Sequence, residues 1–260
     1  MIQPVVLLLL VLSFFAGADA RADVHADNSL SIAVASNFRS TAEDVARAFT
    51  VETGVPIRLS SGSTGKLYAQ VVNGAPYDIF LAADMKRPRL LSESGRGVED
   101  SLQAYVAGQL VLMSADSSIG EDDCLKTLRE GSYRKLAIAN PATAPYGAAA
   151  KAWLQAAGLW GDAESRIIMG ENISQTFQFV ATRNATLGIV SASQLAIAHS
   201  LINPSCHSTI DVPKDHAIQQ GGIILHRTNM PVEARLFMSF LRSNTATELM
   251  IAQGYEVPRL

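Results

Sequence analysis

The chain has 260 residues, of which 48% are hydrophobic and 17% are charged. This balance is typical of a globular protein and excludes a disordered or coiled-coil chain. The 21 Lys and Arg residues nearly match the 24 Asp and Glu residues, and the sequence contains no basic run. Composition and charge therefore disfavour nucleic acid as a partner.

The N-terminus has the pattern of a secretory signal peptide. Val5 to Ala18 is almost unbroken apolar sequence, and Ala18-Asp19-Ala20 fits a signal-peptidase site before Arg21. A membrane anchor is the alternative, but the stretch is shorter than the roughly 20 apolar residues that span a bilayer. No Cys follows the apolar run to serve as an acylation site. We expect residues 1–20 to be removed and the mature chain to be exported.

The rest of the chain alternates short apolar strands with amphipathic helices. The first unit has predicted strands at 30–35, 56–59 and 78–82, and a second unit has them at 136–139, 167–169 and 187–190. Helices with apolar residues at intervals of three and four follow these strands. Because strands that alternate with helices form parallel sheets, the sequence predicts two α/β units.

Two long apolar segments lie between these units, Tyr105 to Ser114 and Ile218 to His226. Each is long enough to run from one unit into the other, and two such crossings make a hinge. The sequence predicts a two-lobed α/β clamshell, with each lobe a mostly parallel sheet flanked by helices. We expect residues 27–107 and 228–260 to form lobe 1 and residues 108–227 to form lobe 2.

Four turns of small polar residues lie where a predicted strand ends and a helix begins. This is the edge at which open α/β sheets bind ligands. A helix N-terminus presents unpaired N–H groups and about half a positive charge. The turns, two in each lobe, are Ser36-Asn37, Ser60 to Gly65, Asn140 to Gly147 and Glu171 to Ser174.

Side chains in these turns add to the donors of the backbone. Hydroxyls of Ser36, Ser63 and Thr64 can donate hydrogen bonds, and Gly62 and Gly65 allow the backbone to approach a ligand closely. The first two turns contain no Asp or Glu to accept a proton, so a fully ionised tetrahedral oxyanion fits better than hydrogen phosphate. For any single turn, helix capping by Ser, Thr or Asn is the alternative explanation.

An oxidising compartment also allows the two cysteines, Cys124 and Cys206, to pair. The alternative is two separate, partly buried thiols, because the sequence does not show whether their Cα atoms approach each other. We expect a disulfide bond between Cys124 and Cys206.

Several motifs together resemble the periplasmic molybdate-binding proteins of ABC importers. The likeness runs from about Leu30 to Gly254 and rests on the order and spacing of Val34 to Phe38, Ser61 to Gln70, Asn73 to Asp78, Ala82 to Asp84 and Asn140 to Gly147. It implies a type II binding-protein fold, a periplasmic monomer without enzymatic activity or cofactor, capture of molybdate or tungstate, and delivery to a membrane permease.

The resemblance also implies which residues bind the oxyanion. Ser36 and Asn37 supply hydroxyl and backbone donors, Thr64 and Ser63 supply donors from the second turn, and Tyr146 and Ile173 supply backbone N–H groups from lobe 2. Some members of the family have a Tyr after the Gly-Ile-Val strand end, where this chain has Ser191. We expect Ser191 to cap the next helix.

Three other interpretations are weaker. Ser63 and Lys66 match the S-x-x-K motif of acyl-transfer enzymes, but the chain lacks the supporting Ser-Asp-Asn and Lys-Thr-Gly motifs. A second alternative is that the chain binds another tetrahedral oxyanion, such as sulfate. The spacing of histidines and carboxylates around Cys206 matches no standard zinc site, so we expect no bound metal cation.

Overall fold

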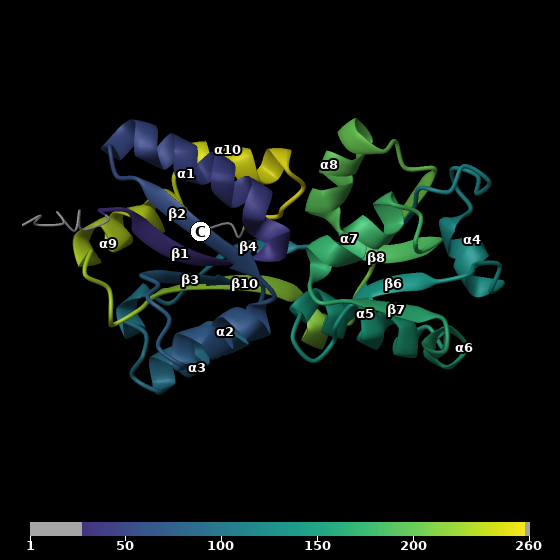
Figure 1. The fold of residues 1–260 in the computed structure, drawn as a ribbon, viewed down its shortest axis with the longest axis horizontal. Coiled ribbons are helices and arrows are strands. Elements are labelled where there is room, and N and C mark those ends of the chain that lie inside the picture. The colour runs from purple at the N-terminus through teal and green to yellow at the C-terminus, as the bar shows by residue number, and fades with distance from the viewer. Residues whose placement is uncertain (1–27, 258–260) are drawn as a thin grey trace, which may run out of the picture.

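The computed structural model describes residues 28–257, except for the side chains of residues 197, 199 and 200. The predicted signal peptide lies outside the described residues. Two α/β lobes lie side by side (Figure 1). No helix in the described part is both long and apolar enough to cross a membrane.

The first lobe is built on a sheet whose strands have the order β2-β1-β3-β10-β4. Its strands are β1 (Leu30–Ala35), β2 (Ile57–Gly62), β3 (Ile79–Ala82), β4 (Gln103–Gly108) and β10 (Ile218–Ile224). Helices cover both faces of the sheet (Figure 1). The helical elements are η1 (Ser36–Phe38), α1 (Arg39–Thr53), α2 (Thr64–Val72), α3 (Lys86–Glu93), η2 (Glu99–Ser101), α9 (Pro231–Phe240) and α10 (Asn244–Ala252).

The second lobe repeats this architecture around a sheet of order β7-β6-β8-β5-β9. Its strands are β5 (Leu110–Ser114), β6 (Leu136–Ala139), β7 (Ile167–Gly170), β8 (Leu187–Ser191) and β9 (Cys206–Ile210). Its helical elements are α4 (Cys124–Arg129), α5 (Pro145–Ala156), α6 (Trp160–Glu164), α7 (Ile173–Ala181) and α8 (Ala192–Leu201), with η3 (Lys214–His216) on the way back to the first lobe.

The two sheets have equivalent topologies. In each sheet the pairing makes all strands point the same way except one, β10 in the first lobe and β5 in the second. These two reversed strands are the ones by which the chain enters the sheet from the other lobe. The predicted fold class is therefore confirmed, with one reversed strand in each mostly parallel sheet.

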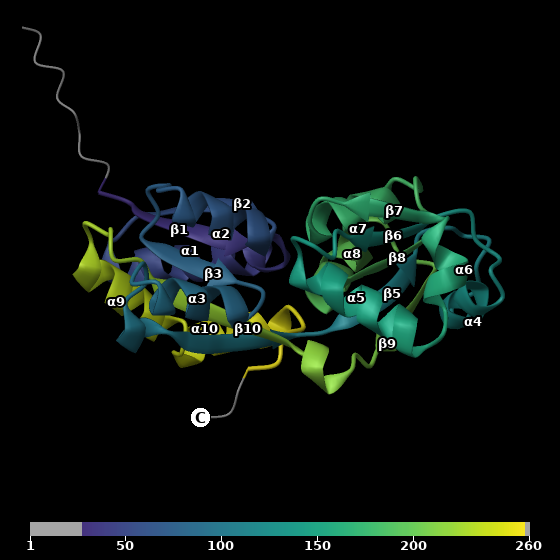
Figure 2. The ribbon, with the colours of Figure 1, turned by 90° about the horizontal axis from the view of Figure 1, so that it is seen from below.

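Both connections between the lobes pass through the same place. The first connection is Gln109, between β4 and β5, as the Tyr105 to Ser114 segment predicts. The second follows β9 and enters β10, where Ile218 is paired with Gly108 at the end of β4. Figure 2 shows the two connections close together, which is the arrangement of a hinge.

The predicted second crossing through Ile218 to His226 is wrong. This segment forms β10, which lies between β3 and β4 in the first sheet, while Ile218 at its start still packs in the core of the second lobe. The chain therefore returns at the start of β10, and the predicted boundary at residue 227 is too late. β10 is buried along most of its length. An apolar run fits a central strand as well as a crossing, and this explains the error.

Each lobe has its own hydrophobic core, which holds its strand ends in place. In the first lobe the apolar stripe of α1, with Val45 and Phe49, packs on the sheet and on α9. The ring of Phe49 stacks edge-on against Phe237, with 5.2 Å between centroids, and against Phe240. Gly54 ends α1 in the left-handed conformation, with φ of 74°, which glycine adopts without steric cost.

A disulfide joins Cys124 at the start of α4 to Cys206 at the start of β9. Their Cα atoms are 5.7 Å apart, and 82 positions separate them in the chain. Both residues are buried in the core of the second lobe. The bridge therefore ties the edge strand β9 to the body of this lobe.

We predict that replacing both cysteines, Cys124→Ser with Cys206→Ser, lowers the free energy of unfolding by about 2–4 kcal/mol, because the unfolded chain regains the freedom of a long loop. Urea unfolding of the oxidised protein measures the change. Wild-type protein kept in a reductant serves as the control and should lose a similar amount. Equal stability of the variant and the oxidised wild type would contradict the prediction.

Candidate functional site

A small cavity lies between the two lobes, where four helices begin. It is lined by residues of η1, of β2 and the start of α2, of the turn into α5 and of the start of α7, and its volume is about 10 Å³, room for roughly one water-sized sphere. All six predicted ligand-binding residues line it: Ser36, Asn37, Ser63, Thr64, Tyr146 and Ile173.

The N-terminus of α2 contributes two hydroxyl groups. Ser63 occupies the N-cap position, yet its side chain makes no capping hydrogen bond. The residue is 2% exposed, and its Oγ has no hydrogen-bond partner among the described residues. Thr64 Oγ1 accepts a hydrogen bond from the N–H of Ala83 at 3.1 Å, so its proton can be donated into the cavity. Capping alone therefore does not explain Ser63.

The second lobe contributes helix starts rather than hydroxyls. Pro145 and Tyr146 are the first two residues of α5, and Ile173 is the first residue of α7. Pro145 has no N–H group, and the N–H groups of Tyr146 and Ile173 lack partners within their own helices. The side chain of Asn172 caps α7 through the N–H of Gln175 at 3.1 Å, which fixes the direction in which this helix begins.

Charged side chains stay outside the cavity lining in the described part of the chain. Lys66 forms an ion pair with Glu171 of the second lobe, 2.8 Å apart, and both side chains are about half exposed. Arg87 pairs with Asp84 in the first lobe. The positive potential at the cavity therefore comes from the converging helix N-termini and not from a cation.

A buried polar network joins the lobes beside the cavity. Asn37 Nδ2 donates to Gln220 Oε1 at 3.0 Å and lies 3.4 Å from the hydroxyl of Tyr146 in the second lobe. The hydroxyl of Tyr255 donates to the carbonyl of Asn37 at 2.7 Å, and Ser193 Oγ of the second lobe donates to the same carbonyl at 3.2 Å. The side chain and the carbonyl of Asn37 thus connect the lobes, which leaves its backbone N–H for a ligand.

Three tyrosines in and around this network remain neutral. Burial raises the pKa of Tyr146 and of Tyr105 well above the usual range, and burial raises the pKa of Tyr255 to about 12. Their hydroxyls therefore hold their protons at physiological pH and place no negative charge beside the cavity.

Several residues of the network carry no signal in the sequence. Gln220, Tyr255 and Ser193 have no motif that marks them, and they meet Asn37 through pairing over long sequence distances. The predicted role of Ser191 is confirmed, because it forms a capping box with Gln194 at the start of α8. The four predicted turns do meet at one place.

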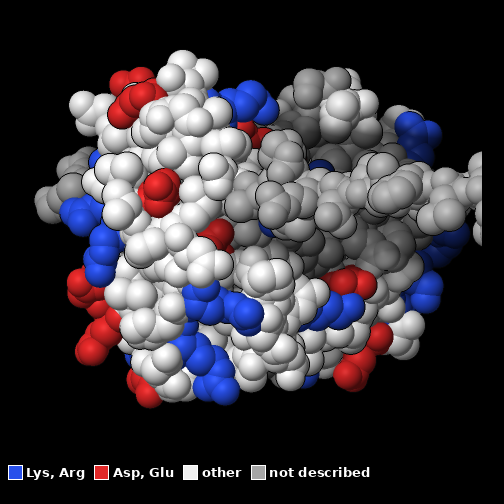
Figure 3. Space-filling model, turned by 60° about the vertical axis from the view of Figure 1, so that its left-hand side comes forward, with Lys and Arg blue, Asp and Glu red and all other residues white. Residues whose placement is uncertain are grey.

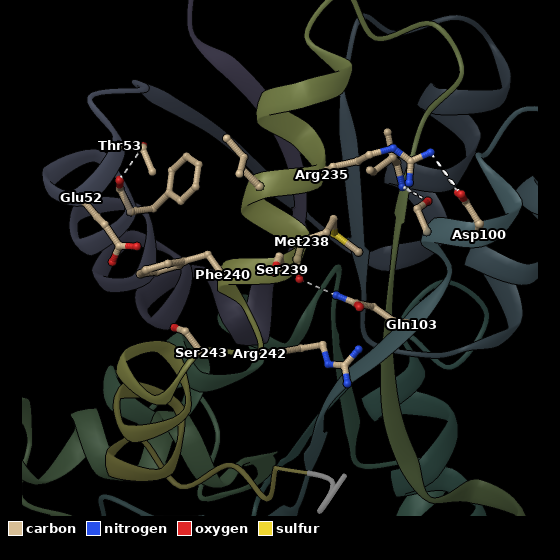
Figure 4. Close-up of a pocket in the computed structure, with 14 residues that line it drawn as sticks. Glu52, Thr53, Asp100, Gln103, Arg235, Met238, Ser239, Phe240, Arg242 and Ser243 are labelled. Atoms are coloured by element: carbon tan, nitrogen blue, oxygen red, sulfur yellow. Dashed lines mark hydrogen bonds and ion pairs between the residues drawn. The ribbon is translucent and has the colours of Figure 1, made fainter.

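A much larger groove lies on the first lobe alone, between α9, the end of α1 and the η2 segment (Figure 4). Its volume is about 650 Å³. Arg235 pairs with Asp100 across it, and Gln103 donates to the carbonyl of Met238 at 2.7 Å. Side chains of both charges line this groove, Glu52 and Asp100 together with Arg235 and Arg242. Figure 3 likewise shows Lys and Arg interspersed with Asp and Glu on the visible face.

Comparison with known proteins places the chain in a family. Residues 30–256 match the model of the family described as bacterial extracellular solute-binding protein. The chain belongs to this family. Within it, the molybdate-binding protein ModA of Azotobacter vinelandii is 39% identical over 228 residues, which are 87% of this chain and 89% of that protein. The ModA protein of Rhodobacter capsulatus is 36% identical, over 86% of each chain.

A solved structure supports the same family membership. The periplasmic molybdate-binding protein of Azotobacter vinelandii superposes with a TM-score of 0.82 at 35% sequence identity, and the match covers 89% of this chain and all of that one. The predicted resemblance to the molybdate-binding family is therefore confirmed, together with the two-lobed fold.

The raised tyrosine pKa values predict how stability depends on pH. A phenol whose pKa is raised by folding stabilises the folded state fully below the pKa of the unfolded chain, near 10, and loses this contribution as the pH rises toward about 12. We expect the free energy of unfolding to fall from about pH 10 upward. Urea unfolding at a series of pH values measures it.

Absorbance of the phenolates gives an independent check of that prediction. In folded protein, Tyr105, Tyr146 and Tyr255 should remain un-ionised at about pH 10.5, whereas all tyrosines should ionise in the unfolded chain. The variant Tyr255→Phe is the control and should show a weaker dependence of stability on pH. Ionisation of every tyrosine of the folded protein near pH 10 would contradict the prediction.

Proposed function

We propose that this chain is a periplasmic binding protein that captures molybdate, and tungstate as well, and delivers it to the permease of an ABC importer. The observation that carries the proposal is the hydroxyl of Ser63, which is buried and has no partner within residues 28–257, at the place where four helix N-termini meet. A buried hydroxyl without a partner costs about 1–3 kcal/mol, and a bound oxyanion removes this cost.

The chemistry of the lining favours a fully ionised tetrahedral oxyanion. Donors come from four directions, and carboxylates are absent from the described lining, so an anion that carries a proton would lack an acceptor for it. A dianion is stabilised by the N-terminal ends of the helix dipoles without a cation. Among such oxyanions molybdate is favoured, because the similar proteins of Azotobacter vinelandii and Rhodobacter capsulatus are molybdate-binding proteins.

The proposed binding residues have separate roles. Ser36 and Asn37 offer a hydroxyl and a backbone N–H at the start of η1, and Ser63 and Thr64 offer two hydroxyls at the start of α2. The second lobe offers the N–H groups of Tyr146 and Ile173. Since four of these residues belong to the first lobe and two to the second, full coordination requires that the lobes close on the ligand. The small volume of the cavity means that the ligand enters while the lobes are apart.

An acyl-transfer enzyme with Ser63 as nucleophile and Lys66 as base is less consistent with the geometry. Such an enzyme needs a base within hydrogen-bond distance of the nucleophile. Ser63 Oγ has no such partner among the described residues, and Lys66 is paired with Glu171 instead. Sulfate shares the charge and shape of molybdate, and the experiment below separates the two.

Isothermal titration calorimetry with molybdate, tungstate, sulfate and phosphate tests the proposal. We expect molybdate and tungstate to bind more tightly than sulfate or phosphate. Ser63→Ala should raise the Kd for molybdate about 10- to 100-fold, since a hydrogen bond to a charged group contributes about 1.5–3 kcal/mol. Its effect on stability without ligand should be small, because Ser63 makes no capping bond.

Ser243→Ala is the matched control. Ser243 is also an N-cap serine, but its side chain accepts a hydrogen bond from the N–H of Ala246 at the start of α10. This variant should lower the free energy of unfolding by about 1 kcal/mol and leave the Kd unchanged. Folded wild-type protein that binds neither molybdate nor tungstate would contradict the proposal.

A further inference from the structure

Gly65 brings the two lobes closer together than any other residue type at this position allows. Its N–H donates to the carbonyl of Thr143, in the turn before α5 of the second lobe, at 2.8 Å. A Cβ atom on Gly65 would lie 2.9 Å from that carbonyl oxygen and 3.0 Å from the Cα of Thr143. Both contacts are with backbone atoms, which cannot rotate away as a side chain can. The absence of a side chain at position 65 therefore allows the close contact between the lobes.

The first lobe alone does not require a glycine here. Gly65 is the second residue of α2, and its φ lies outside the left-handed region, so alanine fits the same backbone conformation. Within the first lobe the near neighbour of the added atom is Arg87 Nη2, 3.2 Å away, at the end of a flexible side chain. Alanine also has a higher helix propensity than glycine. A lobe standing apart from its partner would accept the substitution without loss.

The contact of Gly65 with Thr143 belongs to a ring of contacts around the cavity. Lys66 Nζ is 2.8 Å from Glu171 Oε1, and Ser174 Oγ donates to the carbonyl of Ser36 at 3.1 Å. Each pair joins one lobe to the other within the turns that hold the proposed ligand donors. Figure 1 shows α2 and α5 on opposite sides of the boundary between the lobes, and the contact joins the start of α2 to the turn that precedes α5.

We propose that Gly65 is a positioning residue that sets how far the lobes close, and thereby sets the affinity for the oxyanion. The inference rests on the proposed function. When the lobes close, the backbone N–H of Gly65 gains the carbonyl of Thr143 as its partner. A side chain at position 65 keeps the donors of Tyr146 and Ile173 away from those of Ser63 and Thr64. The apparent affinity then falls with the fraction of molecules that can close.

Gly65→Ala tests this role. We expect the melting temperature without ligand to be equal to or higher than that of the wild type, while the Kd for molybdate rises about 10- to 100-fold. Stopped-flow measurements should place most of the change in the dissociation rate, because the ligand still meets the open lobes freely. A residue with a merely structural role would lower the melting temperature instead.

Gly161→Ala is the matched control, since Gly161 lies in helix α6 and a Cβ there meets nothing within 4 Å. This variant should leave the Kd unchanged. An unchanged Kd for Gly65→Ala, or a lower melting temperature without ligand, would overturn the inference while the effect of Ser63→Ala still supports the proposed function. Wild-type protein that binds no oxyanion would overturn both.

Discussion

An anion taken out of water needs partners for its charge, and in this protein those partners are unpaired backbone N–H groups and hydroxyls. Four helices begin at one cavity, and the described lining contains no charged side chain. Helix N-termini supply a fixed positive potential that requires no titratable group. The rest of the structure holds these four helix starts at the carboxyl ends of the strands of two sheets. It also allows the two lobes to bring these helix starts together.

The division of the donors between two lobes links binding to closure. The reversed strands β5 and β10 carry the chain between the lobes at one point, which allows the lobes to move relative to each other. The network around Asn37 and Tyr146 lies near this hinge, where Gly108 leaves room for the hydroxyl of Tyr146. Gly65 and Lys66, which directly follow the cavity-lining Thr64, contact Thr143 and Glu171 of the second lobe. The network near the hinge and the contacts of Gly65 and Lys66 together define one closed arrangement of the lobes.

Sequence could predict those parts of the site that have local signals. Ser63 and Thr64 stand in a turn with more hydroxyls and glycines than a cap needs, and parallel strands bring such turns to one edge of a sheet. The network could not be predicted, because Gln220 and Tyr255 are 183 and 218 positions from Asn37. The position of β10 was also missed, since an apolar run does not identify the sheet that it joins.

A crystal structure of the molybdate complex tests the central claim most directly. Neutral donors require that each oxygen of the anion lies about 2.7–3.1 Å from a backbone nitrogen or hydroxyl of the four helix starts. The expected donors are Ser36, Asn37, Ser63, Thr64, Tyr146 and Ile173. A lysine or arginine nitrogen within hydrogen-bond distance of the anion would contradict the account, even if the protein bound molybdate tightly.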